Sequence, residues 1–184
     1  MLVEDAIYRR HSTTQFSDKF VLHSMINSIL NKSLSVPHFN QRFNFKIVVI
    51  QQKEQIRKYA KDKIALALKK YGEDNQDYQA LNEAKCIDKA SALLLLYKSK
   101  SIEHDKNDLL TLGALGENIC LLATNHYLGT LWVDKILHIE DDINRIVKIK
   151  DKELCYGIVL GYRDRIYSYQ RDEAISSHNT IEWF

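Results

Sequence analysis

The stretch Ala92-Leu93-Leu94-Leu95-Leu96-Tyr97 is the longest apolar run in the chain. Six residues suit a β-strand, and a strand that is apolar at every position has both of its faces covered. The run is far shorter than the roughly 20 residues that a helix needs to cross a bilayer, so it does not indicate a membrane span. The sequence therefore predicts a buried central strand over 92–97, with the other elements arranged around it.

Helical and strand-like segments alternate on either side of this run. Apolar and β-branched residues predict further strands over 45–50, 129–133 and 154–160. Apolar positions at helical spacing predict a helix over about 17–33, capped by Ser17 or Asp18, and helices over 53–71 (ended by Gly72), 75–89, 109–127 and 139–147. The polar stretches 33–44 and 98–108 are expected to be loops. This alternation predicts an α/β or α+β class, as one domain over 1–184 whose sheet is covered by helices.

Composition excludes several classes of function. The 184 residues are 45% hydrophobic, which is enough to bury a core, and the net charge of +2 gives no electrostatic case for binding nucleic acid. The first turn contains Glu4 and Asp5 and lacks the apolar core of a signal peptide. Cys86, Cys120 and Cys155 are far apart and have no metal-ligand spacing. We therefore expect a cytoplasmic protein with reduced, buried thiols, without a metal site and without a membrane or nucleic-acid partner.

Residues suited to anion binding gather in Tyr8-Arg9-Arg10-His11-Ser12-Thr13-Thr14-Gln15-Phe16. The planar donor fork of arginine matches phosphate, and Ser12 and its neighbours add hydroxyl and backbone N–H donors. Phe16 ends the stretch with an apolar anchor. The segment is therefore either an anion site or a solvated basic surface that follows a short helix.

The apolar helix expected over 109–127 contains two further unusual features. Gly113 and Gly116 each weaken a helix by about 1 kcal/mol relative to alanine, so a close approach of another backbone is expected there. Glu117-Asn118 is either a solvent-facing stripe or a polar pair at a subunit seam or near a bound ring. The chain has no glycine-rich phosphate loop, serine-hydrolase elbow or zinc-protease motif.

Three stretches together resemble the nitroreductase family of flavin enzymes. Arg10-His11-Ser12-Thr13-Thr14-Gln15-Phe16 resembles its opening pattern Arg-(Arg/His)-Ser-x-(Arg/Lys)-x-(Phe/Tyr). Residues 116–123 followed by 128–133 resemble its long core helix and next strand, where Gln-Asn, Leu-Leu-Ala-Ala and Leu-Gly-x-x-Trp are typical. Leu160-Gly161-Tyr162, with Arg171 downstream, resembles its Leu-Gly-Tyr-Pro ending and trailing basic residue. Their order and spacing agree with the family and span nearly the whole chain.

The resemblance implies an α+β sandwich, with a central mixed sheet flanked by helices, that forms a homodimer and binds FMN at the subunit interface. The reaction implied is ping-pong hydride transfer from NAD(P)H, through flavin N5, to a nitroaromatic, quinone or similar acceptor, without a catalytic side chain. The alternatives are a degenerate member that acts as a flavin-binding or interaction protein, and a different reaction on the same fold, such as flavin breakdown or reductive dehalogenation.

The resemblance also assigns the cofactor site residue by residue. The phosphate would be held by Arg10, Ser12 and Arg171, with His11 beside the ribityl chain or phosphate. Backbone groups after Trp132 would face flavin N5 and O4. The residues concerned there are Val133, Asp134 and Lys135, and a loop of the partner subunit would contribute Pro37, His38, Asn40 and Gln41.

The sequence departs from the family at two of these motifs. Thr14 stands where a second cation is usual, and Arg163 stands where proline is usual. A lost charge-assisted hydrogen bond costs about 1.5–3 kcal/mol, so FMN affinity is expected to fall by about tenfold or more unless Arg9 or Arg42 compensates. The chain is also short for the family, so we expect a substrate-covering insertion to be absent or reduced.

The loop over 36–45 resembles the family's Ala-Pro-Ser-x-x-Asn-x-Gln-Pro-Trp stretch only loosely. One register aligns Asn40 and then, after a gap of one residue, Gln41-Arg42-Phe43. The other register is gapless and puts Gln41 at the asparagine and Phe45 at the tryptophan. The sequence leaves both registers open.

Overall fold

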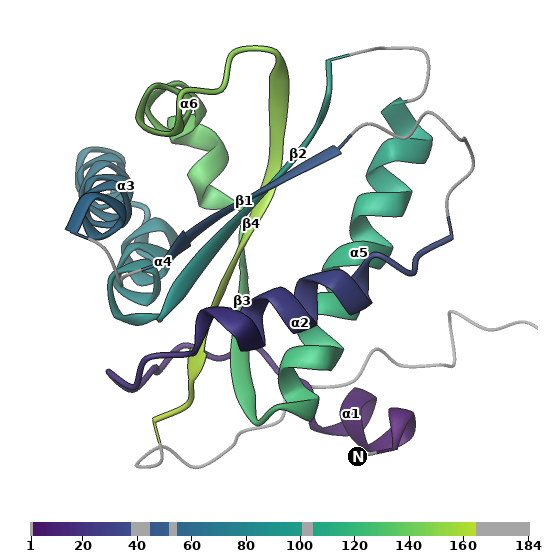
Figure 1. Ribbon diagram of the computed structural model, residues 1–184. Coiled ribbons are helices and arrows are strands. Elements are labelled where there is room, and N and C mark those ends of the chain that lie inside the picture. The colour runs from purple at the N-terminus through teal and green to yellow at the C-terminus, as the bar shows by residue number, and fades with distance from the viewer. Residues whose placement is uncertain (1, 38–44, 52–54, 101–104, 165–184) are drawn as a thin grey trace, which may run out of the picture.

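The computed structural model describes residues 2–37, 45–51, 55–100 and 105–164 (Figure 1). The elements follow one another along the chain as α1 (Val3–Arg9), α2 (His23–Ser33), β1 (Phe45–Gln51), α3 (Gln55–Asp74), α4 (Tyr78–Lys89), β2 (Ala92–Ser99), α5 (Asp105–Asn125), β3 (Leu128–Val133), the short 3₁₀ helix η1 (Lys135–Ile139), α6 (Glu140–Val147) and β4 (Lys152–Tyr162).

Strand β2 is central and buried on both faces, as the apolar run predicts. The sheet order is β1-β2-β4-β3, and each pair of neighbouring strands is antiparallel. Because side chains alternate across a strand, β2 supplies two separate cores. Leu93, Leu95 and Tyr97 enter one core, and the other receives Ala92, Leu94 and Leu96.

Helices cover both faces of the sheet (Figure 1). Buried residues of α3, α4, η1 and α6 form the core on the Leu93 side, and those of α2 and α5 form the core on the Leu94 side. This arrangement confirms the predicted α+β fold with a covered sheet. In the described residues, the parallel pairing of the expected mixed sheet is confined to a bridge between Ser12 and Thr130 at the β3 edge.

Helix α2 begins at His23, so the prediction that Ser17 or Asp18 caps this helix is wrong. Leu22 is the residue before the first turn, and it makes no side-chain cap. The preceding residues are extended because they pair with the sheet: Phe16 bridges Arg163, and the Ser17 N–H donates to the Tyr162 carbonyl at 2.9 Å. Tertiary pairing thus takes precedence over a plausible local cap.

The loop expected over 98–108 is shorter in the structure. β2 continues to Ser99, where the buried ammonium of Lys98 lies 2.7 Å from the Glu153 carboxylate on β4. At the other end of the segment, α5 already begins at Asp105. The ion pair explains how a lysine remains in the strand.

Gly72 does not end its helix, because α3 continues to Asp74. A Cβ atom at Gly72 would lie 2.9 Å from the Leu81 side chain and 3.0 Å from the Asp77 carbonyl oxygen. The glycine therefore allows α3 and α4 to pack closely, which is a different role from the predicted helix stop.

Lys61 on α3 is fully buried and joins α3 to the end of α4. Its Nζ donates to the carbonyl oxygens of Asp88, at 2.8 Å, and Ala90, at 2.7 Å. Carbonyl groups at a helix C-terminus lack partners within the helix and attract positive charge. The Lys61 ammonium therefore caps α4 from its neighbour.

No helix in the described part of the chain is long and apolar enough to cross a membrane. Cys86 and Cys120 are buried free thiols as expected, whereas Cys155 is only partly buried. The described residues contain no cluster of three histidine, cysteine, aspartate or glutamate side chains that could hold a metal ion.

Candidate functional site

The N-terminal basic segment runs along the edge of β3. The Thr13 N–H donates to the Thr130 carbonyl at 2.8 Å, and the Thr13 side chain is buried. Because side chains alternate along an extended chain, Ser12 and Thr14 face the other way and are exposed. Phe16 is buried in the core, as expected for an anchor. The segment therefore presents the hydroxyl groups of Ser12 and Thr14 outward from a fixed edge of the sheet.

Glu117 and Asn118 tether two of the predicted site segments to α5. Arg10 Nε lies 3.5 Å from Glu117 Oε1, and both side chains are partly exposed. Burial raises the pKa of Glu117, and the Arg10 charge opposes this shift. The Asn118 amide donates to the carbonyl oxygens of Ser33 and Ser35, each at 3.3 Å, just before Pro37. These two residues are therefore more than a solvent-facing stripe.

The Trp132 ring packs against side chains of α5 and β4 and remains 38% exposed. The Trp132 ring stacks on Tyr156, with ring centroids 4.1 Å apart, and its Nε1 donates to Cys120 Sγ at 3.2 Å. A Cβ atom at Gly116 would clash with this ring and with the Tyr156 hydroxyl, so Gly116 makes room for two side chains of its own chain. Val133 is fully buried.

A cavity of about 460 Å³ separates the N-terminal segment from α4. Among the predicted site residues that the structure describes, Thr14 lines this cavity. The complete lining is Thr14, Gln15, Phe16, Asn82, Lys85, Cys86, Asp88 and Lys89. The Cys86 thiol donates to the Thr14 carbonyl at 3.4 Å and so connects the two walls.

Sequence reasoning missed the lining residues on α4; besides Cys86 and Asp88, these are Asn82, Lys85 and Lys89. Their spacing of three and four residues places them on one face of α4. That spacing is visible in the sequence, but a polar helix face of this kind is usually only solvated surface. In the fold, the exposed Thr14 lies across the cavity from this face, which distinguishes a cavity wall from ordinary solvated surface.

On its buried side, α4 is tied to the turn that follows β3. Glu83 is buried, and its Oε2 accepts the Lys135 N–H at 3.0 Å. Gln79 Nε2 donates both to Glu83 Oε1, at 3.2 Å, and to Asp134 Oδ1, at 3.1 Å. The Lys135 N–H, which the resemblance assigns to the flavin, therefore already has an acceptor in this chain.

Two carboxyl groups on α4 have opposite pKa shifts. Burial, with the nearby Asp134 carboxyl, raises the pKa of Glu83 to about 7. Asp77 caps the start of α4 by accepting the Ala80 N–H at 3.1 Å; this hydrogen bond and the Lys135 ammonium lower the pKa of Asp77. Asp77 is thus held ionised, whereas Glu83 changes its charge near neutral pH.

The remaining predicted residues are divided between described and undescribed parts of the chain. Pro37 is exposed, and His11 Nδ1 lies 3.0 Å from the Arg9 carbonyl oxygen. His38, Asn40, Gln41 and Arg171 lie outside the described residues, as does the loop register that the sequence left open.

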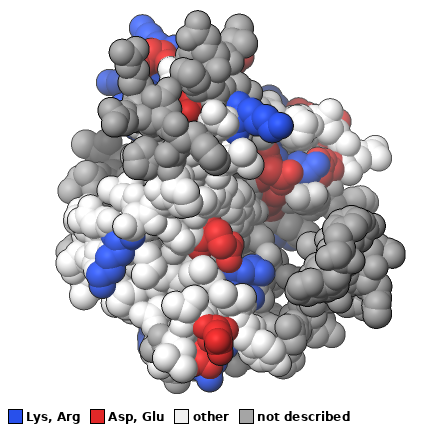
Figure 2. Space-filling model, turned by 90° about the vertical axis from the view of Figure 1, so that its right-hand side faces the viewer, with Lys and Arg blue, Asp and Glu red and all other residues white. Residues whose placement is uncertain are grey.

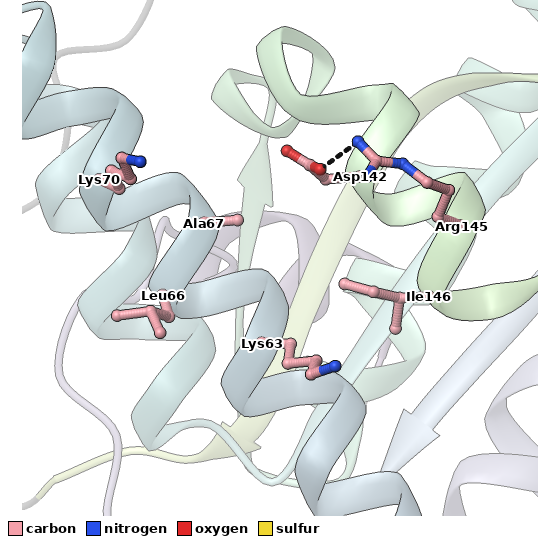
Figure 3. A pocket seen from close by; sticks show the side chains of 7 residues that line it. All are labelled: Lys63, Leu66, Ala67, Lys70, Asp142, Arg145 and Ile146. Carbon is pink, nitrogen blue, oxygen red and sulfur yellow. Dashed lines mark hydrogen bonds and ion pairs between the residues drawn. The ribbon is translucent and has the colours of Figure 1, made fainter.

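Other hollows in the described structure lie away from the basic segment. One of about 450 Å³ lies between α3 and α6, with the ammonium groups of Lys63 and Lys70 at its edge and an ion pair of 2.6 Å between Arg145 and Asp142 (Figure 3). A groove of about 560 Å³ lies between α3 and α4 and includes the exposed Leu66. Neither is lined by a described residue of the predicted site, so the cavity at Thr14 is the candidate site.

Comparison with known proteins supports one family. The model of the nitroreductase family matches residues 7–162. No curated protein sequence matches the chain. A variant of the FMN- and NADPH-dependent nitroreductase NfnB from Sphigopyxis sp. strain HMH has a similar structure, with a TM-score of 0.83 and 15% identity over 100% of this chain and 99% of that one.

Two further solved structures have the same fold. A nitroreductase-type protein from Desulfovibrio desulfuricans in complex with FMN has a TM-score of 0.71 and 19% identity, over 94% of this chain and 92% of that one. A BluB-like flavoprotein from Clostridium difficile 630 has a TM-score of 0.74 and 18% identity, over 95% of each chain. At these identities the likeness shows the fold alone.

The raised pKa of Glu83 predicts how stability depends on pH. In the folded chain this carboxyl has a pKa of about 7, above the ordinary value of 4.5, so between these values the folded state holds the extra proton. The free energy of unfolding that Glu83 contributes therefore falls as pH rises through this window. Because Glu83→Gln removes the titration, its stability relative to the wild type should increase by roughly 1–3 kcal/mol between pH 5 and pH 8.

Urea unfolding at the two pH values measures this difference. Glu73→Gln is the matched control, since Glu73 is an exposed carboxylate on α3 and should give nearly the same difference at both values. A Glu83→Gln difference that does not change with pH would show that Glu83 titrates normally.

Proposed function

The chain belongs to the nitroreductase family, and we propose that it is an FMN-dependent oxidoreductase with NAD(P)H as donor and a nitroaromatic, quinone or similar small molecule as acceptor. One observation carries the proposal: the end of the motif segment, residues 14–16, lines the same cavity as two lysines of α4, Lys85 and Lys89, beside Asp88. Bound FMN would supply the redox chemistry, by taking up hydride and passing it on in alternate half-reactions. A cytoplasmic setting, where NAD(P)H is available, fits this function.

The described residues fit FMN by the chemistry of their donor groups. Arg10 and Ser12 offer a guanidinium fork and a hydroxyl for the phosphate, while Asn82 offers both a donor and an acceptor for the polar edge of the ring. Lys85 and Lys89 line the cavity beside Thr14, so they can replace the cation that the family usually has at that position. Arg9, proposed from the sequence for this compensation, is exposed at the end of α1.

Lys85 is the residue that we assign to the negative charge of the reduced ring. A fixed ammonium group in a partly closed cavity stabilises developing negative charge more than the same group in water does. The alternative site on α4 is Lys89, one turn further along the same face. Both lysines lie opposite the motif segment, so either one can stabilise the reduced ring without a cation from elsewhere in the described chain.

We also propose that the functional unit is a homodimer. The face formed by α1 and α5 is largely uncharged (Figure 2) and contains the exposed apolar side chains of Leu2, Val3, Ile7, Leu109 and Leu110. Exposed apolar side chains on an otherwise uncharged face are common at protein interfaces. On α5, a Cβ atom at Gly113 would meet nothing within 4 Å, so this glycine, unlike Gly116, can lie at a subunit seam.

The proposed activity predicts that the protein incubated with FMN retains the flavin through gel filtration. NADH or NADPH should then bleach its absorbance in the absence of oxygen, and a quinone or nitroaromatic should restore it. Retained flavin that neither nucleotide bleaches would favour the flavin-binding, non-redox alternative. A protein that does not retain FMN would overturn the proposal.

Variants at the cavity should separate contact residues from surface charge. We expect Arg10→Ala and Lys85→Gln each to weaken FMN binding by about 10- to 100-fold, because each removes a charge-assisted hydrogen bond of about 1.5–3 kcal/mol. Arg9→Ala, with its exposed side chain, should change affinity by less than about threefold. Fluorescence titration of the flavin-free protein gives the three dissociation constants, and equal losses at Arg9 and Arg10 would mean that the motif register is wrong.

The dimer proposal predicts a mass of twice 21.5 kDa by light scattering at low micromolar concentration. Gly113→Leu should shift this mass toward one chain without unfolding it, because the new side chain meets open space in a single chain. Lys69→Leu is the control, since it adds an exposed leucine on α3, on the opposite side of the sheet. If the Gly113→Leu protein remains dimeric, then α5 does not lie at the subunit interface around Gly113.

A further inference from the structure

A buried carboxylate joins α4, which forms one wall of the candidate cavity, to the turn that follows β3. Glu83 lies between Asn82 and Lys85 in sequence but faces inward, while those two residues line the cavity. Its Oε2 accepts the backbone N–H of Lys135, which follows Val133 and Asp134. One side chain therefore connects the cationic wall on α4 to the turn after β3.

Further contacts hold the same turn against the same helix. Gln79 bridges Glu83 Oε1 to Asp134 Oδ1, at 3.2 and 3.1 Å. At the start of α4, Asp77 Oδ2 lies 3.1 Å from Lys135 Nζ. Asp134 and Lys135 are thus tied to α4 through one backbone contact and two side-chain contacts. Glu83 accepts the backbone hydrogen bond, which the Lys135 N–H donates.

A carboxylate is a costly choice for this position. Ala80 and Ile87, one turn before and one turn after Glu83, are fully buried, so an apolar residue would fit the core pattern of α4. Burying a carboxylate is unfavourable unless hydrogen bonds compensate. Here the Lys135 N–H at the start of η1 requires an acceptor, and Glu83 supplies it.

Resting on the proposed function, we infer that Glu83 is a positioning residue that fixes α4 against the Asp134–Lys135 turn and so sets the position of the Asn82–Lys85 wall of the FMN site. Glu83 itself does not line the cavity. It acts through the Lys135 backbone on one side and through the orientation of the Asn82–Lys85 face on the other. Losing this contact should therefore weaken flavin binding although no contact to the flavin is removed.

The variants Glu83→Ala and Glu83→Gln separate positioning from charge. Alanine leaves the Lys135 N–H without an acceptor, whereas glutamine keeps an oxygen for it. The glutamine NH2 then replaces the oxygen that accepts from Gln79, and it can donate to Asp134 or to the Gln79 carbonyl oxygen. In the flavin-free protein, hydrogen exchange of the Lys135 amide should be at least tenfold faster in Glu83→Ala and within about threefold of the wild type in Glu83→Gln. FMN dissociation constants should follow the same order, with at least a tenfold loss for alanine and rescue by glutamine. Glu73→Ala and Glu73→Gln are the matched surface controls.

Each outcome decides a separate point. Faster exchange of the Lys135 amide with unchanged FMN affinity in Glu83→Ala would make the contact merely structural and overturn the inference alone. Unchanged exchange would also overturn it. Failure of the wild type to bind FMN would overturn the proposed function, and the inference with it. If Glu83→Ala does not fold, Glu83→Asp replaces it, because its carboxylate is one methylene further from the Lys135 amide and should reproduce both losses.

Discussion

The burial of β2 on both faces is the constraint on which the rest of the structure depends. One strand supplies Leu93, Leu95 and Tyr97 to one core and Leu94 and Leu96 to the other, so neither helical layer can be removed without exposing it. A strand that is apolar at every position does not penalise a one-residue slip by itself. Its register must come from polar partners: the Tyr97 hydroxyl donates to Asn144 Oδ1 at 3.0 Å, and Lys98 pairs with Glu153. Between Leu96 and Tyr97 the pairing with β4 shifts by one residue. As a result, Lys98 lies directly opposite Glu153.

Sequence reasoning succeeds where one local signal decides the structure. The apolar run predicts the central strand, and three short motifs predict the family that its model then confirms over residues 7–162. It fails where distant residues decide: Ser17 resembles a helix cap but pairs with Tyr162, and Gly116 suggests a close backbone approach but accommodates the Trp132 side chain. Lys85 was missed for the same reason, since nothing local distinguishes it from a solvated lysine until the fold brings α4 to Thr14.

Helix α4 is the element that connects the fold to the candidate site. Polar contacts hold it at its start through Asp77, along its length through Glu83 and beyond its last turn through Lys61. Its outward face lines the cavity, so the same contacts that stabilise the helix also set where Asn82 and Lys85 lie. The position of this cavity wall is therefore set by contacts of the helix, although the wall itself consists of surface side chains.

The buried Lys61 also implies an asymmetric constraint on how this protein can evolve. Its ammonium group is held by the main-chain oxygens of residues 88 and 90, and every amino acid has such an oxygen. The cap therefore requires a long cationic side chain at position 61, while these two hydrogen bonds place no demand on the side chains of residues 88 and 90. Among descendants of one ancestor, the hydrogen bonds to these two carbonyl oxygens should favour a cation at position 61 without selecting the side chains that follow them.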